Sequence, residues 1–184
     1  LVLTYAGKLY DQFGARWVGM AVSIILSIVL VLLSQSDRII GFFISDNGNS
    51  PIYAGFAMAI LMVLFFGLRF SGQGVLTMVS RNMLMKWFVA RRGLVNGISS
   101  VFVSLGFSVA PLTFDMLIQG TSWRGAWLLM ALFIGVFFTF FVFIFFRDNP
   151  EDLGMIPDGE KHGNREHDVT IKAFKQFTLP EARK

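Results

Sequence analysis

The chain of 184 residues is 54% hydrophobic, has 15% charged residues and contains no cysteine. Soluble domains average about 25% charged residues, and a chain without cysteine has no disulfides or thiolate metal sites. The formal net charge of +4 would suit a nucleic-acid-binding protein. The basic residues, however, lie between long apolar segments, which argues against nucleic acid as a partner.

Four segments contain no Asp, Glu, Lys, Arg or His: residues 17–36, 47–68, 93–114 and 125–146. Each is about as long as the ~20 residues that a helix needs to cross the ~30 Å hydrocarbon core of a lipid bilayer. The sequence therefore predicts an all-α polytopic membrane protein. In chain order we expect the end of a helix at 1–6, a loop at 7–16, and spans at about 17–36, 54–80, 93–117 and 124–146.

The lysines and arginines between the spans predict the orientation of residues 1–146, the transmembrane region. Two basic residues, Arg38 and Arg124, lie on one side of the membrane, and seven lie on the other side: Lys8, Arg16, Arg81, Lys86, Arg91, Arg92 and Arg147. Cytoplasmic loops are enriched in lysine and arginine. We therefore expect the loops 7–16 and 81–92 and the polar tail 147–184, a central linker, to face the cytoplasm of a plasma (inner) membrane.

The ends of the chain lead us to expect a fragment of a longer protein. Leu1 lies in an apolar context without a preceding Met, and the chain stops within a polar tail. We expect a further helix before Leu1 and further spans after Lys184. In the tail, His162 and His167 lie among polar residues, and solvation is favoured there over metal binding, so no cofactor is expected.

Arg69 interrupts an apolar span twelve residues before Arg81. At ~1.5 Å per residue this separation places Arg69 about 18 Å deep, near the middle of the bilayer. An arginine at this depth costs on the order of 3 kcal/mol to insert, so its side chain should face the protein interior or a water-filled cavity. Gln73, Thr77 and Ser80 lie on the same helical face.

The span at 93–117 has a stripe of small and polar residues, whose members are Asn96, Ser100, Ser104, Ser108, Gly93, Gly97, Pro111 and Asp115. Small residues allow close helix packing, and Pro111 should kink the helix because it removes a backbone hydrogen bond. The glycines favour packing. For the serines, packing and the lining of an aqueous path are both open alternatives. Asp115 is expected near the outer membrane boundary.

The segment AGKLYDQFGARWVGM, residues 6–20, resembles the signature loop between the second and third helices of the major facilitator superfamily. The family pattern Gly-x-Leu-x-Asp-x-x-Gly-x-Arg is matched by Gly7, Leu9, Asp11, Gly14 and Arg16. Two usually basic positions of the loop are not basic here. In the family this loop forms a cytoplasmic latch between the two halves of the transporter. The resemblance thus implies a gate formed by Gly7, Asp11, Gly14 and Arg16, in which Gly7 leaves room for a neighbouring helix.

Further segments resemble the same family in the same order: RFSGQG (69–74), KWFVARRGLVNGISS (86–100), SWRGAW (122–127), FFRDNPEDLGMIPDG (145–159) and TLPEA (178–182). The second of them is similar to monocarboxylate-type and oxalate/formate-type members. The resemblance covers nearly the whole chain. It implies the N-terminal half of a twelve-helix bundle without its first helix: the end of helix two, helices three to six and most of the central loop.

The resemblance implies a secondary transporter that works by alternating access. The arginine at the midplane favours a small organic anion, such as a monocarboxylate, as the solute, with protons among the candidate coupling ions. In this hypothesis Arg69 attracts the anion and Gln73 and Ser104 add hydrogen bonds. Thr77 and Ser100 complete the expected cavity lining.

Three alternatives compete with this hypothesis. The first is a transporter of a sugar, nitrate or a drug. For drug efflux, the fifth-helix motif of drug/proton antiporters is mostly absent, since only Gly106 and Pro111 match it. The second is a non-transporting receptor or scaffold, because a fold does not dictate an activity. The third, an intramembrane enzyme, is disfavoured because the spans contain no His or Cys and only Asp115 as a carboxylate.

Overall fold

The computed structural model describes residues 2–43 and 51–147, and all the regular elements over these ranges are helices. The α-helices are α1 (Val2–Ser34), α2 (Ser36–Phe43), α3 (Pro51–Leu68), α4 (Thr77–Trp87), α5 (Arg92–Gly120), α6 (Trp123–Leu132) and α7 (Thr139–Phe145). Two π-helices, η1 (Arg69–Leu76) and η2 (Phe133–Phe138), join α3 to α4 and α6 to α7. Four helices are long and apolar enough to cross a membrane: Thr4–Ser34, Ala54–Trp87, Arg92–Gly120 and Trp123–Phe145. The all-α, four-span prediction is confirmed.

The connections between the spans are shorter than predicted. The expected loop at 7–16 is helical up to Phe13, and the expected loop at 81–92 is reduced to residues 88–91. Charged side chains mark the edge of the membrane, but long lysine and arginine side chains extend into the headgroup region without ending a helix. The positions of the charged residues therefore predict the edge of the membrane better than they predict where a helix ends. The linker expected at 147–184 lies outside the described residues except for Arg147.

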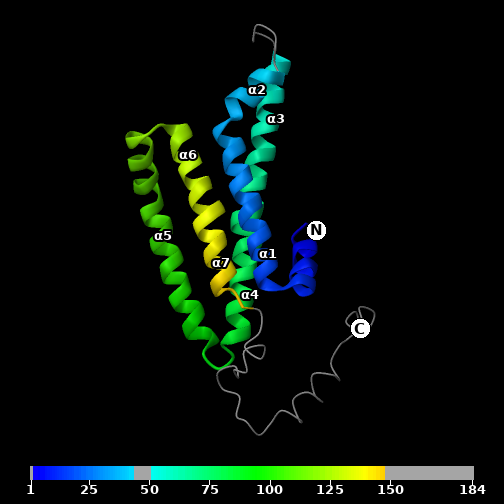
Figure 1. The fold of residues 1–184 in the computed structure, drawn as a ribbon, viewed down its shortest axis with the longest axis vertical. Helices are drawn as coiled ribbons and strands as arrows, with labels where there is room; N and C mark the ends of the chain where they lie inside the picture. The colour runs from blue at the N-terminus through cyan, green and yellow to red at the C-terminus, as the bar shows by residue number, and fades with distance from the viewer. Residues whose placement is uncertain (1, 44–50, 148–184) are drawn as a thin grey trace.

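α1 is the central helix of the bundle. It lies between α3, η1 and α4 on one side and α6, η2 and α7 on the other, while α5 lies at the outer edge beside α6 (Figure 1). The larger core cluster is formed by Ala6, Tyr10, Ala15, Val18, Val22, Val75, Val79, Val142 and Phe146. α5 contributes no buried residue among those described. One face of α5 is therefore left free to line a groove.

Two glycines allow α6–η2–α7 to approach α1 closely. A Cβ atom at Gly19 would lie 2.9 Å from Val142 Cγ1, and one at Gly135 would meet Ser27 Oγ and lie 3.0 Å from Ser27 Cβ. The Ser27 hydroxyl donates to the carbonyl of Ala131 at 2.8 Å, which ties α1 to α6 directly. This pairing of a small residue with an interhelical hydrogen bond is typical of membrane helix packing.

The glycines for which the sequence predicts a packing role are in a different situation. Within the described part of the chain, a Cβ atom added at Gly93 or at Gly97 would meet nothing within 4 Å. The packing role of these two glycines therefore stays a prediction that needs a partner segment. Pro111 lies inside α5, which continues as a helix from Arg92 to Gly120, and its expected kink likewise stays a prediction.

Gly14 breaks α1 into a short N-terminal piece and the long central helix (Figure 1). Its backbone has φ 81° and ψ 171°, a combination that residues with a Cβ atom rarely adopt. The cluster of charged residues and glycines within residues 6–20 thus contains a sharp change of direction between two helical pieces, and Gly14 is the residue that makes it.

Replacing Gly14 with alanine should therefore destabilise the fold. We expect Gly14→Ala to cost about 1–3 kcal/mol, the strain of a non-glycine residue in this backbone region. Gly55→Ala is the matched control, because Gly55 is helical and a Cβ atom there meets nothing within 4 Å among the residues that the structure describes. Thermal denaturation in detergent, followed by size-exclusion chromatography, measures both. Equal midpoints for the two variants would contradict the role of Gly14.

An ion pair joins α2 to the start of α6 on the side predicted to face outward. The Arg124 guanidinium donates to the Asp37 carboxylate, and this hydrogen bond holds the pKa of Asp37 below its ordinary value. A carboxyl whose pKa is lowered on folding stabilises the folded state above its unfolded pKa, about 4 for aspartate. That contribution is lost as the pH falls through the lower, folded pKa.

The Asp37–Arg124 pair therefore predicts an acid dependence of stability. Between pH 6 and pH 3, the denaturation midpoint of the wild type should fall more than that of Asp37→Asn. The effect is small because both side chains are 42% exposed and water screens exposed pairs. Parallel pH profiles for the wild type and Asp37→Asn would refute this contribution.

Candidate functional site

A groove of about 1270 Å³ runs between η1–α4 and α5. Five residues that the sequence predicts as cavity-lining all line it: Arg69, Gln73, Thr77, Ser100 and Ser104. The first three come from η1 and α4 and the last two from α5, so the polar faces of two successive helices lie opposite each other. The structure thus brings the whole predicted set together in one cavity.

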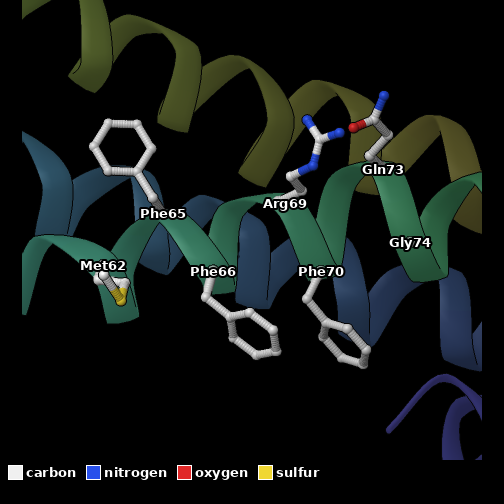
Figure 2. Close-up of a pocket in the computed structure, with 7 residues that line it drawn as sticks. All are labelled: Met62, Phe65, Phe66, Arg69, Phe70, Gln73 and Gly74. Carbon is white, nitrogen blue, oxygen red and sulfur yellow. The ribbon is translucent and has the colours of Figure 1, made fainter. Parts of the chain in front are cut away.

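Arg69 lies near the middle of the Ala54–Trp87 span, at the first residue of η1. In Figure 2, Arg69 and Gln73 project together from one side of the helix, and Phe66 and Phe70 project from the opposite side. A second cavity of about 680 Å³ is lined by Met62, Phe65, Phe66, Arg69, Phe70, Gln73 and Gly74. Phe65, Arg69 and Gln73 line both cavities, so the guanidinium borders each of them.

The hydroxyls of the groove differ in the hydrogen bonds that they can offer. Ser100 donates to the carbonyl of Asn96 at 2.8 Å and Thr77 donates to that of Gly72 at 3.4 Å, so both protons point to their own helix. Within the described residues, the Ser104 hydroxyl and the side chains of Arg69 and Gln73 have no hydrogen-bond partner. Of the five predicted cavity residues, Arg69, Gln73 and Ser104 therefore have donors free for a solute.

The π-helix η1 is a feature that sequence reasoning missed. A π-helix is wider than an α-helix and is frequent at functional sites. Gly72 and Gly74 lie within η1, and glycine tolerates such irregular backbone because it has no Cβ atom. Thr77 at the end of η1 and Thr139 at the end of η2 each donate to the carbonyl five residues earlier. This threonine position after a glycine-containing stretch is a signal that the sequence did contain.

The predicted gate residues are not among the lining residues of the groove and lie at the end of the bundle where α4 ends, since Lys86 of α4 lies over the Tyr10 ring. Arg16 Nε donates to the carbonyl of Phe146 at 3.2 Å, and its guanidinium lies 5.4 Å from the Phe143 ring centroid. Arg16 thus caps the C-terminal end of α7, where cations interact favourably with the helix dipole. Asp11 is exposed, and within the described residues no ion pair joins it to Arg16.

The close-approach role expected for Gly7 has no counterpart here. A Cβ atom at Gly7 would meet nothing within 4 Å in the described chain. The cap that Arg16 forms involves only helices of this bundle, so the structure shows it. A latch between two halves of a transporter also requires residues of the second half. Of the four gate residues, the structure therefore explains Gly14 through its backbone and Arg16 through its cap, and the latch itself stays a prediction.

The helix order, the arginine within a membrane span and the signature-loop residues are features of one known protein family. The family model of the Major Facilitator Superfamily matches residues 1–180. The chain belongs to the major facilitator superfamily. Within this superfamily, the chain is 29% identical over 133 residues to MFS-type transporter 1 of an Ophiocordyceps species. It is 26% identical over 145 residues to the probable sulfoacetate transporter SauU of Cupriavidus necator.

These matches cover 70% and 79% of the chain but 25% and 29% of the two superfamily members. The chain thus spans less than a third of the length of the curated relatives that it matches. No solved structure matches it significantly. His162 and His167 lie outside the described residues, and within those residues no group of three or more His, Cys, Asp or Glu side chains could hold a metal ion.

Proposed function

We propose that this chain is part of a secondary transporter that moves a small organic anion, such as a monocarboxylate, by alternating access. The observation that carries the proposal is Arg69, an arginine in the middle of a span. It lines a groove in which the described lining residues include no acidic side chain. A guanidinium at the depth of the membrane core without a carboxylate partner is costly. An anion that enters the groove offsets that cost.

The geometry of the free donors suits a carboxylate. A guanidinium presents paired N–H groups that match the two carboxylate oxygens. Gln73 lies one turn along η1 beside Arg69 (Figure 2), and its amide adds an N–H donor. Ser104 supplies a hydroxyl from α5, on the opposite wall of the groove. In this proposal Thr77 and Ser100 shape the wall, because their protons already bond to their own helices.

The relatives support an anionic solute. One of them is a probable sulfoacetate transporter, and sulfoacetate carries a carboxylate and a sulfonate. Both groups are oxyanions that present at least two oxygen atoms, and arginine binds such groups through charge-assisted hydrogen bonds. This relative leaves the choice between a monocarboxylate and a sulfonate open, and Arg69 recognises the chemistry that they share.

The gate proposal concerns the end of the bundle that the charge bias predicts to be cytoplasmic. Arg16 holds the last carbonyl of the α7 end in this half. Asp11 stays exposed on the same short helix piece and can accept hydrogen bonds from a second half of the transporter. Protons are the first coupling ion to test, and the membrane is proposed to be the plasma (inner) membrane.

The test uses the full reading frame that contains residues 1–184, purified and reconstituted into proteoliposomes. Uptake of labelled pyruvate and sulfoacetate is measured with and without a pH gradient. Unlabelled lactate, glucose, nitrate and ethidium serve as competitors. We expect saturable uptake of at least one of the two anions, with competition by lactate and none by glucose or ethidium. Saturable transport of glucose or ethidium, without transport of either anion, would contradict the proposal.

A further inference from the structure

Arg81 lines the same groove as Arg69, at the end where residues 88–91 connect α4 to α5. Its side chain is exposed and, within the described part of the chain, makes no ion pair or hydrogen bond. An arginine offers five N–H donors. At the mouth of the groove these donors are open to any solute that approaches from this side.

α4 and α5 run antiparallel away from their short connection, so residues close to the connection lie at the same end of the groove. Arg81 and Asn96 are the polar lining residues nearest to it on α4 and α5, respectively, while Arg69 and Ser104 lie farther along. Arg69 and Arg81 are separated by twelve residues, about 18 Å along the helix. One small anion cannot contact both guanidiniums at the same time.

Between the two arginines the groove has polar side chains set among apolar ones. Gln73 and Thr77 lie on one side and Ser100 on the other, and among the described lining residues there is no acidic side chain. Low-dielectric walls with charge of one sign focus the field and concentrate ions of the opposite sign. The groove therefore has a positive potential from its mouth to its centre.

We propose that Arg81 together with Asn96 forms a vestibule site, which binds a small carboxylate or sulfonate anion before the anion moves on to Arg69. This inference rests on the proposed function, because it assigns the first binding step to the same groove. Arg92 lies at the same end of the bundle but outside the groove lining. If Arg81 only reflected the general enrichment of basic residues at this membrane face, Arg81 and Arg92 would affect the groove equally. In a vestibule site, only Arg81 affects it.

The absence of cysteine from these residues permits a direct test of the potential in the groove. Ser100→Cys is introduced into the full reading frame, with any cysteine outside residues 1–184 replaced by serine. In proteoliposomes, the labelling rates are measured with an anionic reagent, 2-sulfonatoethyl methanethiosulfonate, and a cationic reagent, 2-(trimethylammonium)ethyl methanethiosulfonate. Neutral methyl methanethiosulfonate corrects each variant for folding and accessibility.

Adding Arg81→Gln should lower the ratio of the anionic to the cationic rate about five-fold, since one charge acts on the two reagents with opposite sign. Arg81→Lys should keep the ratio, because it keeps the charge, and Arg92→Gln should leave it unchanged. An unchanged ratio in Arg81→Gln, or an equal fall in Arg92→Gln, would overturn the vestibule site.

Uptake of pyruvate and sulfoacetate by the same vesicles separates this inference from the proposed function. A five-fold change in the ratio of labelling rates, in vesicles that transport neither anion, would support Arg81 as an anion site and refute pyruvate and sulfoacetate as the transported solutes. Anion uptake with an unchanged ratio would retain the proposed function and overturn the vestibule site.

Discussion

Arg69→Gln should abolish saturable anion uptake, with kcat/KM reduced about 100-fold or more. Truncating one partner of a desolvated, hydrogen-bonded charge pair costs on the order of 3 kcal/mol, and glutamine offers neither the charge nor the paired N–H groups of arginine. Arg69→Lys keeps the charge but loses the bidentate geometry, so it should retain part of the activity. Initial rates of pyruvate and sulfoacetate uptake in proteoliposomes, at several concentrations, measure both variants.

As a control, the amount of folded protein is compared between each variant and the wild type. Arg69 is an exposed residue in the groove, so we expect both variants to elute as the wild type does in size-exclusion chromatography. If Arg69→Gln transports every anion that the wild type carries, at the wild-type rate, Arg69 has no role in binding the solute.

Gly135→Val should destabilise the bundle by about 2 kcal/mol, the typical cost of overpacking a close contact. A Cβ atom at this position meets Ser27 Oγ and lies 3.0 Å from Ser27 Cβ. The serine must then rotate or the helices must separate, and either change weakens the hydrogen bond from Ser27 to Ala131. The midpoint of thermal denaturation in detergent measures the loss.

Gly106→Val is the matched variant, because it introduces the same side chain into a helix at a position where a Cβ atom meets no described residue within 4 Å. The intrinsic cost of valine in a helix is common to both variants, so the difference between them isolates the contact with α1. Equal denaturation midpoints for Gly135→Val and Gly106→Val would show that α1 and η2 do not depend on this close approach.

Much of the architecture could be predicted because it depends on length and charge along the chain. The four charge-free segments predicted four spans, and helical periodicity placed Gln73 and Thr77 on the face of Arg69 and Ser100 on the face of Ser104. Periodicity describes each helix alone, however, and does not fix the rotation of one helix about its axis relative to another. That α5 turns its serines toward Arg69 became visible only in the packed structure.

Which glycines lie at close helix contacts could not be predicted from the sequence. Gly93 and Gly97 lie in a polar stripe and were assigned to packing, yet the described chain places nothing near them. Gly19 and Gly135 lie in apolar runs and do set the approach of helices to α1. A missing side chain indicates that close contact is allowed, but it does not say which surface is in contact. Only the neighbours, here Val142 and Ser27, decide that.

The two π-helices were missed for a related reason. Local sequence favours a continuous α-helix through residues 54–87, and the change to π geometry at Arg69–Leu76 occurs where this helix packs beside α1. Gly72 lies 3.6 Å, measured from a built Cβ, from Leu26 of α1. Arg69 is the first residue of η1. The segment whose helix type could not be predicted therefore carries the proposed site.

The central claim is that the transported anion sits between Arg69 on η1 and Ser104 on α5. Protection of a Ser104→Cys variant tests it most directly, with neutral methyl methanethiosulfonate as the label and the transported anion added at saturating concentration. We predict that the anion slows labelling at least several-fold, and that Arg69→Gln removes this protection. Labelling at the same rate with and without the anion, in a variant that still transports it, would contradict the account.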